Sequence, residues 1–281
     1  MKTMPELPEI TVIAQQMNEE IAGKRIAEIE ARQPKNLNMP VSKFAKTIKG
    51  KTVKSVESHG KWLFLKLDRD YSLLINLGMG AELIHFNPAQ KLPEKYHFKL
   101  AFSDKTGFVA HFWWFGYIHL VTEKDLPKHK MTAQLGKSPK DKAFTLKCFK
   151  ESLASKKTGV KSFLLDQKNV AGIGNVYVQD ILFKAKLHPN RKISTLTETE
   201  KSALFKAIKE VLNHSIRLKG LAYEIDFYGQ RGKFTGEHFL VGYKTGKPCP
   251  ECNTPIEKIK TGSTSSYICP KCQPLEWKMQ G

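Results

Sequence analysis

Two cysteine pairs near the end of the chain constrain its fold more than any other feature. Cys249 and Cys252 form one Cys-x-x-Cys motif, and Cys269 and Cys272 form a second, with sixteen residues between the pairs. Each pair suits a tight turn, and two such turns supply the four thiolates of a tetrahedral, structural Zn²⁺ site. A pair of redox dithiols is the alternative, but such motifs usually open a helix in a βαβ unit, which this sequence does not show. The pattern therefore predicts a zinc ribbon, stabilised by its metal.

Charge identifies the partner class. The 281 residues carry 46 Lys and Arg against 27 Asp and Glu, a formal net charge of +19, which attracts polyanions such as nucleic acid. A membrane surface is the rival partner, but no apolar run approaches a transmembrane length and no signal peptide is apparent. We therefore expect a soluble intracellular protein, and its length allows two domains of ordinary size. Because the other cysteines are paired, Cys148 is expected to be a buried apolar side chain.

The chain begins with an unusual proline motif, Met4-Pro5-Glu6-Leu7-Pro8-Glu9. If Pro5 becomes the first residue, its secondary amine is a nucleophile that can attack an aldehyde-like carbon and form an iminium, and Glu6 is placed to handle protons. The alternative is a stiff lead-in to a helix.

Periodicity predicts an α+β chain. A helix is expected over 9–21. Antiparallel strands are expected over 51–120, from short apolar runs at 53–56, 62–65, 73–75, 98–102 and 108–112. A polar, lysine-rich linker is expected over 136–161, with a short helix over 144–154. The second half is expected to be helical, over 162–167, 175–184 and 198–218. Lys61 follows a turn glycine between two strands, where a lysine is usually only solvated. Asn175 follows two glycines at a helix start, where backbone N–H groups can approach a phosphate, although such glycines are often steric.

Together these motifs resemble the formamidopyrimidine-DNA glycosylase and endonuclease VIII family of base-excision repair enzymes. The resemblance covers nearly the whole chain and is carried by the Pro5-Glu6 motif, the turn lysine Lys61, the 164–167 and 170–177 stretches, His188-Pro189 and the four-cysteine ribbon. It implies an α+β fold with an N-terminal antiparallel β-sandwich and flanking helices, then a helix-two-turn-helix domain with a zinc ribbon. The expected boundaries are 1–130 for the catalytic β-sandwich domain, 131–160 for a linker, 161–240 for the helix-two-turn-helix domain and 241–281 for the ribbon.

The resemblance also implies a chemistry. Pro5 would attack C1′ of a flipped-out nucleotide, Glu6 would protonate the opening sugar, and Lys61 would bind a phosphate and assist the later elimination, giving glycosylase and abasic-site lyase activity. Four further residues match DNA-contacting positions, with Met79 filling the gap left by the flipped nucleotide: Met79, His97, Lys156 and Asn175. The expected partner is double-stranded DNA with a damaged base or abasic site, the expected state is a monomer, and the expected location is the cytoplasm, at the nucleoid in a bacterium.

Three features depart from the family pattern. Met1-Lys2-Thr3 precede the motif, so Pro5 is terminal only if they and Met4 are absent from the mature chain. Thr264 stands where the family usually has a ribbon arginine that binds phosphate. Trp113 and Trp114 stand where the family has an arginine pair, so an indole that stacks replaces a guanidinium that reads the opposite base. The 223–241 stretch loosely resembles the segment that covers the flipped base.

Two other functions also fit the sequence. The departures suggest a protein that binds damaged or abasic DNA without cutting it. A zinc-ribbon nucleic-acid-binding factor unrelated to repair fits the charge and the cysteines, but it leaves the Pro5-Glu6 motif unexplained.

Overall fold

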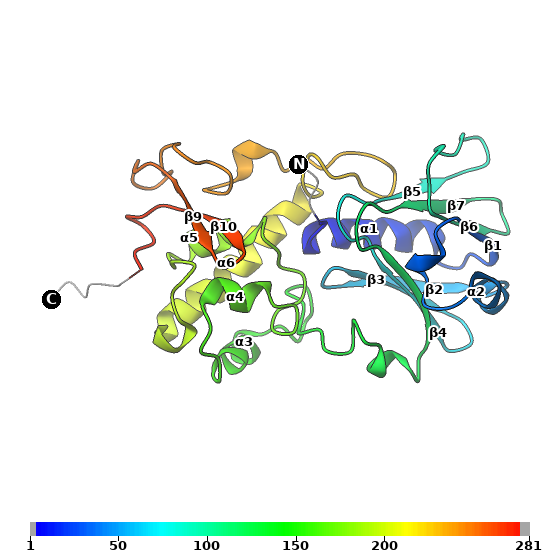
Figure 1. Cartoon of the computed structure of the whole chain (residues 1–281), viewed down its shortest axis with the longest axis horizontal. Coiled ribbons are helices and arrows are strands. Elements are labelled where there is room, and N and C mark those ends of the chain that lie inside the picture. Colours follow the sequence, from blue (N-terminus) through cyan, green and yellow to red (C-terminus); the bar gives the residue numbers. More distant parts are fainter. Residues whose placement is uncertain (1–3, 276–281) are drawn as a thin grey trace. The chain divides into compact units, whose positions relative to one another are not determined.

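The computed structural model describes residues 4–275, which form two compact units (Figure 1). Unit 1 contains the described residues up to 134 together with the 218–233 segment. Unit 2 contains 135–217 and the described residues from 234 onward. The chain therefore passes from unit 1 to unit 2, returns for sixteen residues, and passes back. The finer four-part division expected from the sequence stays a prediction.

Unit 1 is built on two four-stranded antiparallel sheets. The first has the order β2-β3-β4-β8, from β2 (Val53–His59), β3 (Trp62–Leu67), β4 (Tyr71–Asn76) and β8 (Tyr117–Thr122). The second has the order β1-β6-β7-β5, from β1 (Ile26–Ala31), β6 (Phe98–Phe102), β7 (Gly107–His111) and β5 (Glu82–Phe86). The predicted antiparallel sandwich is confirmed.

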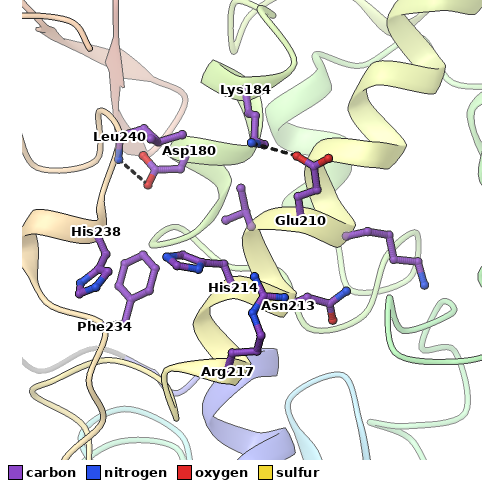
Figure 2. A pocket seen from close by; sticks show the side chains of 11 residues that line it. Asp180, Lys184, Glu210, Asn213, His214, Arg217, Phe234, His238 and Leu240 are labelled. Atoms are coloured by element: carbon purple, nitrogen blue, oxygen red, sulfur yellow. Dashed lines mark hydrogen bonds and ion pairs between the residues drawn. The ribbon is translucent and has the colours of Figure 1, made fainter. Parts of the chain in front are cut away.

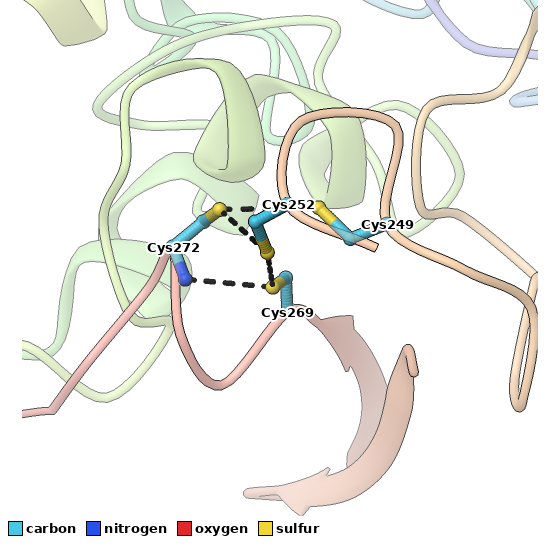
Figure 3. Close-up of side chains that lie close together, drawn as sticks. All are labelled: Cys249, Cys252, Cys269 and Cys272. Atoms are coloured by element: carbon cyan, nitrogen blue, oxygen red, sulfur yellow. Dashed lines mark hydrogen bonds between the residues drawn. The ribbon is translucent and has the colours of Figure 1, made fainter. Parts of the chain in front are cut away.

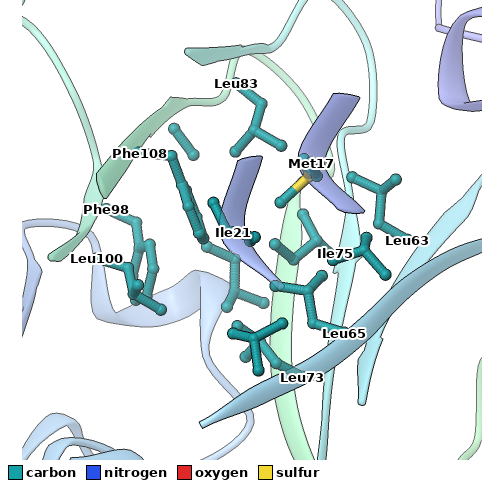
Figure 4. Packing of buried hydrophobic residues seen from close by; sticks show 14 of the residues in the cluster. Met17, Ile21, Leu63, Leu65, Leu73, Ile75, Leu83, Phe98, Leu100 and Phe108 are labelled. Atoms are coloured by element: carbon teal, nitrogen blue, oxygen red, sulfur yellow. The ribbon is translucent and has the colours of Figure 1, made fainter. Parts of the chain in front are cut away.

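Helix α1 (Leu7–Ile21) runs through the core of unit 1. Figure 4 shows Met17 and Ile21 among side chains of both sheets, including Leu63 and Ile75 on one side and Phe108 on the other. The first half of α1, residues 7–14, is buried all round, whereas in the second half only Met17 and Ile21 are buried, along one stripe. Helix α2 (Val41–Ile48) adds Phe44 and Ile48 to the same core.

The fully buried side chain of Phe227 anchors the 218–233 segment to the core of unit 1. Phe227 lies in the same core, and the His85 N–H on β5 donates to the Phe227 carbonyl (2.8 Å). On α1, the Gln16 amide donates to Asp226 Oδ2 (2.7 Å), and Gln16 Oε1 accepts from the Phe227 N–H (3.0 Å). The segment is thus a fixed part of unit 1 although it is distant in sequence.

Unit 2 is mostly helical. Its elements are α3 (Leu146–Leu153), α4 (Val160–Leu165), α5 (Val178–Lys184), α6 (Glu198–Arg217) and the hairpin of β9 (Glu257–Thr261) and β10 (Thr264–Ile268). Helix α5 packs against α4, α6 and β10. Short 3₁₀ turns occur in both units, η1 (Pro34–Asn36), η2 (Leu126–Lys128), η3 (Ile193–Thr195) and η4 (Gly236–His238). The expected helices are confirmed to within a few residues at their ends.

One sequence expectation about packing is wrong. Cys148 is half-buried rather than buried, because it lies on α3 beside the fully buried Phe149, on a flank of the short helix that is only partly covered.

Candidate functional site

Pro5 and Glu6 are buried directly before α1. Glu6 caps this helix in a reciprocal arrangement: its carboxylate accepts from the Glu9 N–H, and Glu9 Oε2 accepts from the Glu6 N–H (2.9 Å). Such a capping box satisfies N–H groups that have no partner inside the helix. The acid next to Pro5 is therefore held by the frame of α1.

Glu9 was missed by the sequence reasoning, although its spacing three residues after Glu6 is the capping-box signal. Its second oxygen, Oε1, accepts from the Leu221 N–H (3.0 Å). Gly220 allows this close approach, since a Cβ there would lie 2.9 Å from Glu9 Oε1. Glu9 thus joins the start of α1 to the 218–233 segment.

Lys61 occupies the turn between β2 and β3, as predicted, next to Gly60 with a positive φ of 60°. Asn76, at the end of β4, fixes this turn by donating from Nδ2 to the Lys61 carbonyl (3.0 Å). Asn76 Oδ1 also accepts from the Gly78 N–H (3.0 Å). One buried amide therefore positions both the Lys61 turn and the loop that carries Met79.

Met79 pairs through its backbone with an exposed aromatic loop. Its N–H donates to the Trp114 carbonyl (2.9 Å), and the Trp114 N–H donates to the Met79 carbonyl (3.3 Å). The side chains of Trp113, Trp114 and Phe115, here called the aromatic tip, are 56%, 59% and 65% exposed, and Met79 is 37% exposed. Gly78 permits this pairing because a Cβ there would lie 2.0 Å from the Trp114 carbonyl oxygen. Four large apolar side chains are thus held out to solvent.

His97 holds the start of this loop through a hydrogen bond and a ring contact. Its Nδ1 accepts from the Phe112 N–H (3.0 Å), and its ring stacks on His111 with centroids 4.6 Å apart. Burial lowers the pKa of His97, and the neighbouring His111 lowers it further, which favours the neutral ring that this acceptor role requires. Its contact with DNA stays a prediction.

In unit 2, Asn175 is joined to the β9–β10 hairpin by Gln179. The Gln179 amide donates to the Asn175 carbonyl (2.9 Å), to Asn175 Oδ1 (3.2 Å) and to the Ser265 carbonyl (3.3 Å). Gln179 Oε1 accepts from the Tyr267 N–H (3.1 Å). Asn175 itself is half-exposed, and Lys156 lies half-exposed in the loop between α3 and α4. The two glycines before Asn175 mark that residue in the sequence, whereas no local sequence motif marks Gln179.

The four predicted zinc ligands lie together (Figure 3). Their ligand atoms are all within 4.8 Å of one another, with the Cys252 Sγ 3.4 Å from Cys269 Sγ and 3.5 Å from Cys272 Sγ. Hydrogen bonds with Thr254 lower the pKa of Cys252 to about 6, whereas burial raises the pKa of Cys269 and of Cys272. Four cysteines leave no coordination position open, as in structural zinc sites, so these residues would hold a structural zinc ion.

A cavity of about 460 Å³ in unit 2 lies beside α5 and α6 (Figure 2). Asp180 lines it and accepts from the N–H groups of 240–242 at 2.9–3.0 Å, while Lys184 forms an ion pair with Glu210 (2.9 Å). Burial raises the pKa of Asp180, and these backbone hydrogen bonds oppose the rise. None of the predicted catalytic or DNA-binding residues lines this cavity.

Three protein-family descriptions match successive parts of the chain. The formamidopyrimidine-DNA glycosylase N-terminal domain matches residues 4–113, the formamidopyrimidine-DNA glycosylase H2TH domain matches 135–226, and a zinc finger found in FPG and IleRS matches 246–275. Among the described residues, no helix combines the length and apolar character needed to cross a membrane.

Relatives and solved structures match over nearly the whole chain. The formamidopyrimidine-DNA glycosylase of Pelotomaculum thermopropionicum is 35% identical over 97% of this chain and 100% of its own length, and that of Streptococcus mutans is 34% identical over 96% and 99%. The Lactococcus lactis Fpg in complex with abasic-site DNA has a TM-score of 0.87 at 28% identity, covering 96% of this chain and 99% of that one. A structure of MutM with DNA containing carbocyclic 8-oxo-G has a TM-score of 0.87 at 29% identity, covering 96% and 100%.

Proposed function

This chain belongs to the formamidopyrimidine-DNA glycosylase family, and we propose that Pro5, Glu6 and Lys61 are the residues that carry its chemistry. The protein is a DNA glycosylase with abasic-site lyase activity, and it acts in base-excision repair on DNA that contains a damaged base or an abasic site. The observation that carries the assignment is the buried Glu6 carboxylate, held by the helix frame directly after Pro5.

The proposed reaction begins with attack of the Pro5 nitrogen on C1′ of the flipped-out nucleotide. The C1′–base bond breaks, the base leaves with the bonding electrons, and it takes up the proton that the Pro5 nitrogen loses on becoming a tertiary amine. Glu6 donates its proton to the sugar ring oxygen as the C1′–O4′ bond breaks, which gives an iminium between Pro5 and C1′. Loss of a C2′ proton then expels the 3′ phosphate, with Lys61 binding phosphate and assisting this proton transfer. The nitrogen must be an amine, so the reaction requires a chain that begins at Pro5. The preceding Met1-Lys2-Thr3 lie outside the described residues.

The proposed DNA contacts divide by unit. In unit 1, Met79 fills the space of the flipped nucleotide and the aromatic tip stacks on neighbouring bases. In unit 2, Asn175 and Lys156 bind phosphates, and the hairpin of the zinc ribbon contacts the DNA. The high positive charge supports binding to DNA, and we place the protein in the cytoplasm, at the nucleoid in a bacterium.

The aromatic tip bears on specificity. An indole at Trp113 has one N–H donor and a large stacking face, so it cannot make the two parallel hydrogen bonds by which a guanidinium identifies a base. We propose that this enzyme discriminates weakly among opposite bases. Because Thr264 and Trp113 also weaken lesion placement, 8-oxoguanine is not assumed to be the preferred lesion, and an oxidised pyrimidine, a ring-opened purine or a bare abasic site fits the residues as well.

Trapping with borohydride tests the function. Protein whose intact mass begins at Pro5 should form a covalent adduct with an abasic-site duplex, and Pro5→Gly should lose most of it. Pro8→Gly, which changes the other proline of the same motif, is the matched control and should retain the adduct. If protein with a confirmed Pro5 terminus forms no adduct yet binds the duplex tightly, the function is recognition of damaged DNA without cleavage.

A further inference from the structure

Lys161 is a buried cation with no carboxylate partner among the described residues. It is 1% exposed and lies in the first turn of α4. Its ammonium donates three hydrogen bonds to the hairpin, to Thr264 Oγ1 (3.0 Å), the Ser265 carbonyl (2.7 Å) and Ser266 Oγ (2.9 Å). All three acceptors are neutral. A buried charge without an opposite charge is unfavourable, so this arrangement suggests that the opposite charge comes from a ligand.

Two half-exposed polar side chains, Thr264 and Asn175, belong to the hydrogen-bonded network of Lys161. Thr264 is half-exposed beside the exposed turn of Gly262 and Ser263. The Ser265 carbonyl, which accepts from Lys161, also accepts from the Gln179 amide, and that amide donates to Asn175 Oδ1. With Oδ1 engaged, the NH₂ group of Asn175 is the part of the side chain that can donate to a ligand. One hydrogen-bonded network of unit 2 therefore connects the buried charge to two half-exposed polar side chains.

We propose that a phosphate of the bound DNA is the counter-ion of Lys161, with Thr264 and Asn175 donating hydrogen bonds to it and Lys161 supplying the charge from beneath. Thr264 Oγ1 accepts from Lys161, so its proton is free to turn from its present acceptor, the Thr261 carbonyl (3.2 Å), to the phosphate. A hydroxyl and a buried ammonium together then replace the single exposed arginine expected at position 264. Lys161 is a positioning residue, since it makes no hydrogen bond to the phosphate itself: its charge attracts the phosphate and its ammonium holds the Thr264 hydroxyl in place.

Because a lysine supplies the positive charge in place of an arginine, DNA binding should depend on pH. Burial lowers the pKa of Lys161 to about 8, whereas an arginine would stay charged throughout. A phosphate opposite Lys161 favours the charged form, so binding above neutral pH takes up a proton. The other titratable groups on the elements around Lys161 are Asp166, Asp180, Lys184, His188, Arg191, Lys192, Glu257, Lys258, Lys260 and Tyr267. The lowering has burial as its sole cause, so none of these groups produces it.

Calorimetry on a duplex that cannot be cleaved tests the proposal. Titrating the protein with a tetrahydrofuran abasic-site duplex at pH 8.5, in two buffers of different ionisation enthalpy, gives the number of protons taken up. The wild type should take up roughly half a proton or more beyond Lys161→Met, and its affinity should fall about tenfold between pH 7 and 9 while that of the variant falls less. Thr264→Val should weaken binding at pH 7 without abolishing proton uptake.

Lys51→Met is the matched control. Lys51 is also a buried lysine whose pKa burial lowers, but it lies in unit 1 over the Tyr71 ring (4.0 Å). The Lys51→Met variant should keep the proton uptake that depends on Lys161. Equal proton uptake by the wild type and Lys161→Met would overturn the proposal.

If Lys161→Met loses its zinc or its fold, Lys161→Arg replaces it. This variant keeps the charge and should bind DNA without the pH-dependent uptake, whereas unchanged uptake would count against Lys161 as its source. The proposal rests on the proposed function only in taking DNA as the ligand. Because binding is measured on an uncleavable duplex, failure of borohydride trapping would leave this test unaffected.

Discussion

Glu9 of unit 1 and Lys161 of unit 2 are both buried charges in the first turn of a helix, yet they are stabilised in different ways. Glu9 accepts hydrogen bonds from the Glu6 and Leu221 N–H groups, at the helix end where the dipole favours an anion. Lys161 lies at the corresponding end of α4, where the dipole disfavours a cation, and its acceptors are three neutral oxygens. The acid is satisfied within its own unit, whereas the lysine is satisfied fully only when an anion arrives.

The difference indicates a division of tasks. Unit 1 holds Glu6, Lys61 and the aromatic tip in place through hydrogen bonds that involve the backbone, and catalysis by pre-organised groups requires such fixed positions. Unit 2 contains the buried Lys161 ammonium, whose opposite charge is a phosphate of the DNA backbone. Substitutions at the start of α1 should therefore change the rate of base release, and substitutions around the hairpin should change DNA affinity.

The largest effect is expected from Glu6→Gln. An amide cannot donate the proton that opens the sugar, so base release should fall by about 10²–10⁴-fold. Duplex affinity should stay nearly unchanged, because Gln keeps the shape and can still cap α1. Single-turnover excision and binding to an uncleavable duplex measure the two separately. Glu19→Gln, an exposed position on the same helix, is the control and should be as active as the wild type. A Glu6→Gln protein with full excision activity would contradict the assignment of the acid.

Loss of the metal should act on unit 2. Cys269→Ser removes one of the four zinc ligands, and the hairpin that it anchors carries Thr264. We expect loss of zinc and a fall in DNA affinity of about tenfold or more, because the ribbon depends on its metal for folding. Metal analysis and binding titration measure this. Cys148→Ser lies outside the cluster and should keep both properties. A Cys269→Ser variant that lacks zinc but binds DNA normally would show that the ribbon is dispensable for binding.

A gain of specificity is expected from Trp113→Arg. The guanidinium can make the bidentate contact that the indole cannot, so excision opposite one base should be favoured by about tenfold over the others. Excision rates opposite each of the four bases give the ratio, and Trp113→Phe should keep the weak discrimination of the wild type. Strong opposite-base preference in the wild type would instead mean that bases are read by residues other than the tip.

Sequence reasoning succeeded where the chemistry is local. The Pro5-Glu6 motif, the cysteine pairs and apolar strands such as β3 and β4 are contiguous, so their patterns are visible in the sequence. It missed β1, β5 and β8 as separate strands. Each of these lies at a sheet edge with exposed or half-exposed positions, so its apolar signal is diluted.

The missed residues depend on contacts between distant parts of the chain. Asn76 bonds the Lys61 turn fifteen positions earlier, and Lys161 meets its acceptor Thr264 across 103 positions. Phe227 enters a core made by the first hundred or so residues. Single-sequence patterns report which residues share a helix face or a strand face, and they carry no information about which distant loop will meet that face.

The last expected effect concerns stability and completes the comparison of the two buried charges. The pKa of Lys161 is about 8 in the folded protein against 10.5 for an ordinary lysine, so between these values the unfolded chain binds more protons. Stability without DNA should therefore rise with pH from about 8 to 10.5, by at most about 1.4 kcal/mol per pH unit, and the penalty should be fully present below pH 8. Urea unfolding of the wild type minus that of Lys161→Met isolates this contribution, since the zinc thiolates titrate in both proteins. Added uncleavable duplex should abolish the difference, because the phosphate then stabilises the charged form. A difference that is flat across this range, with and without DNA, would mean that Lys161 keeps an ordinary pKa and needs no phosphate.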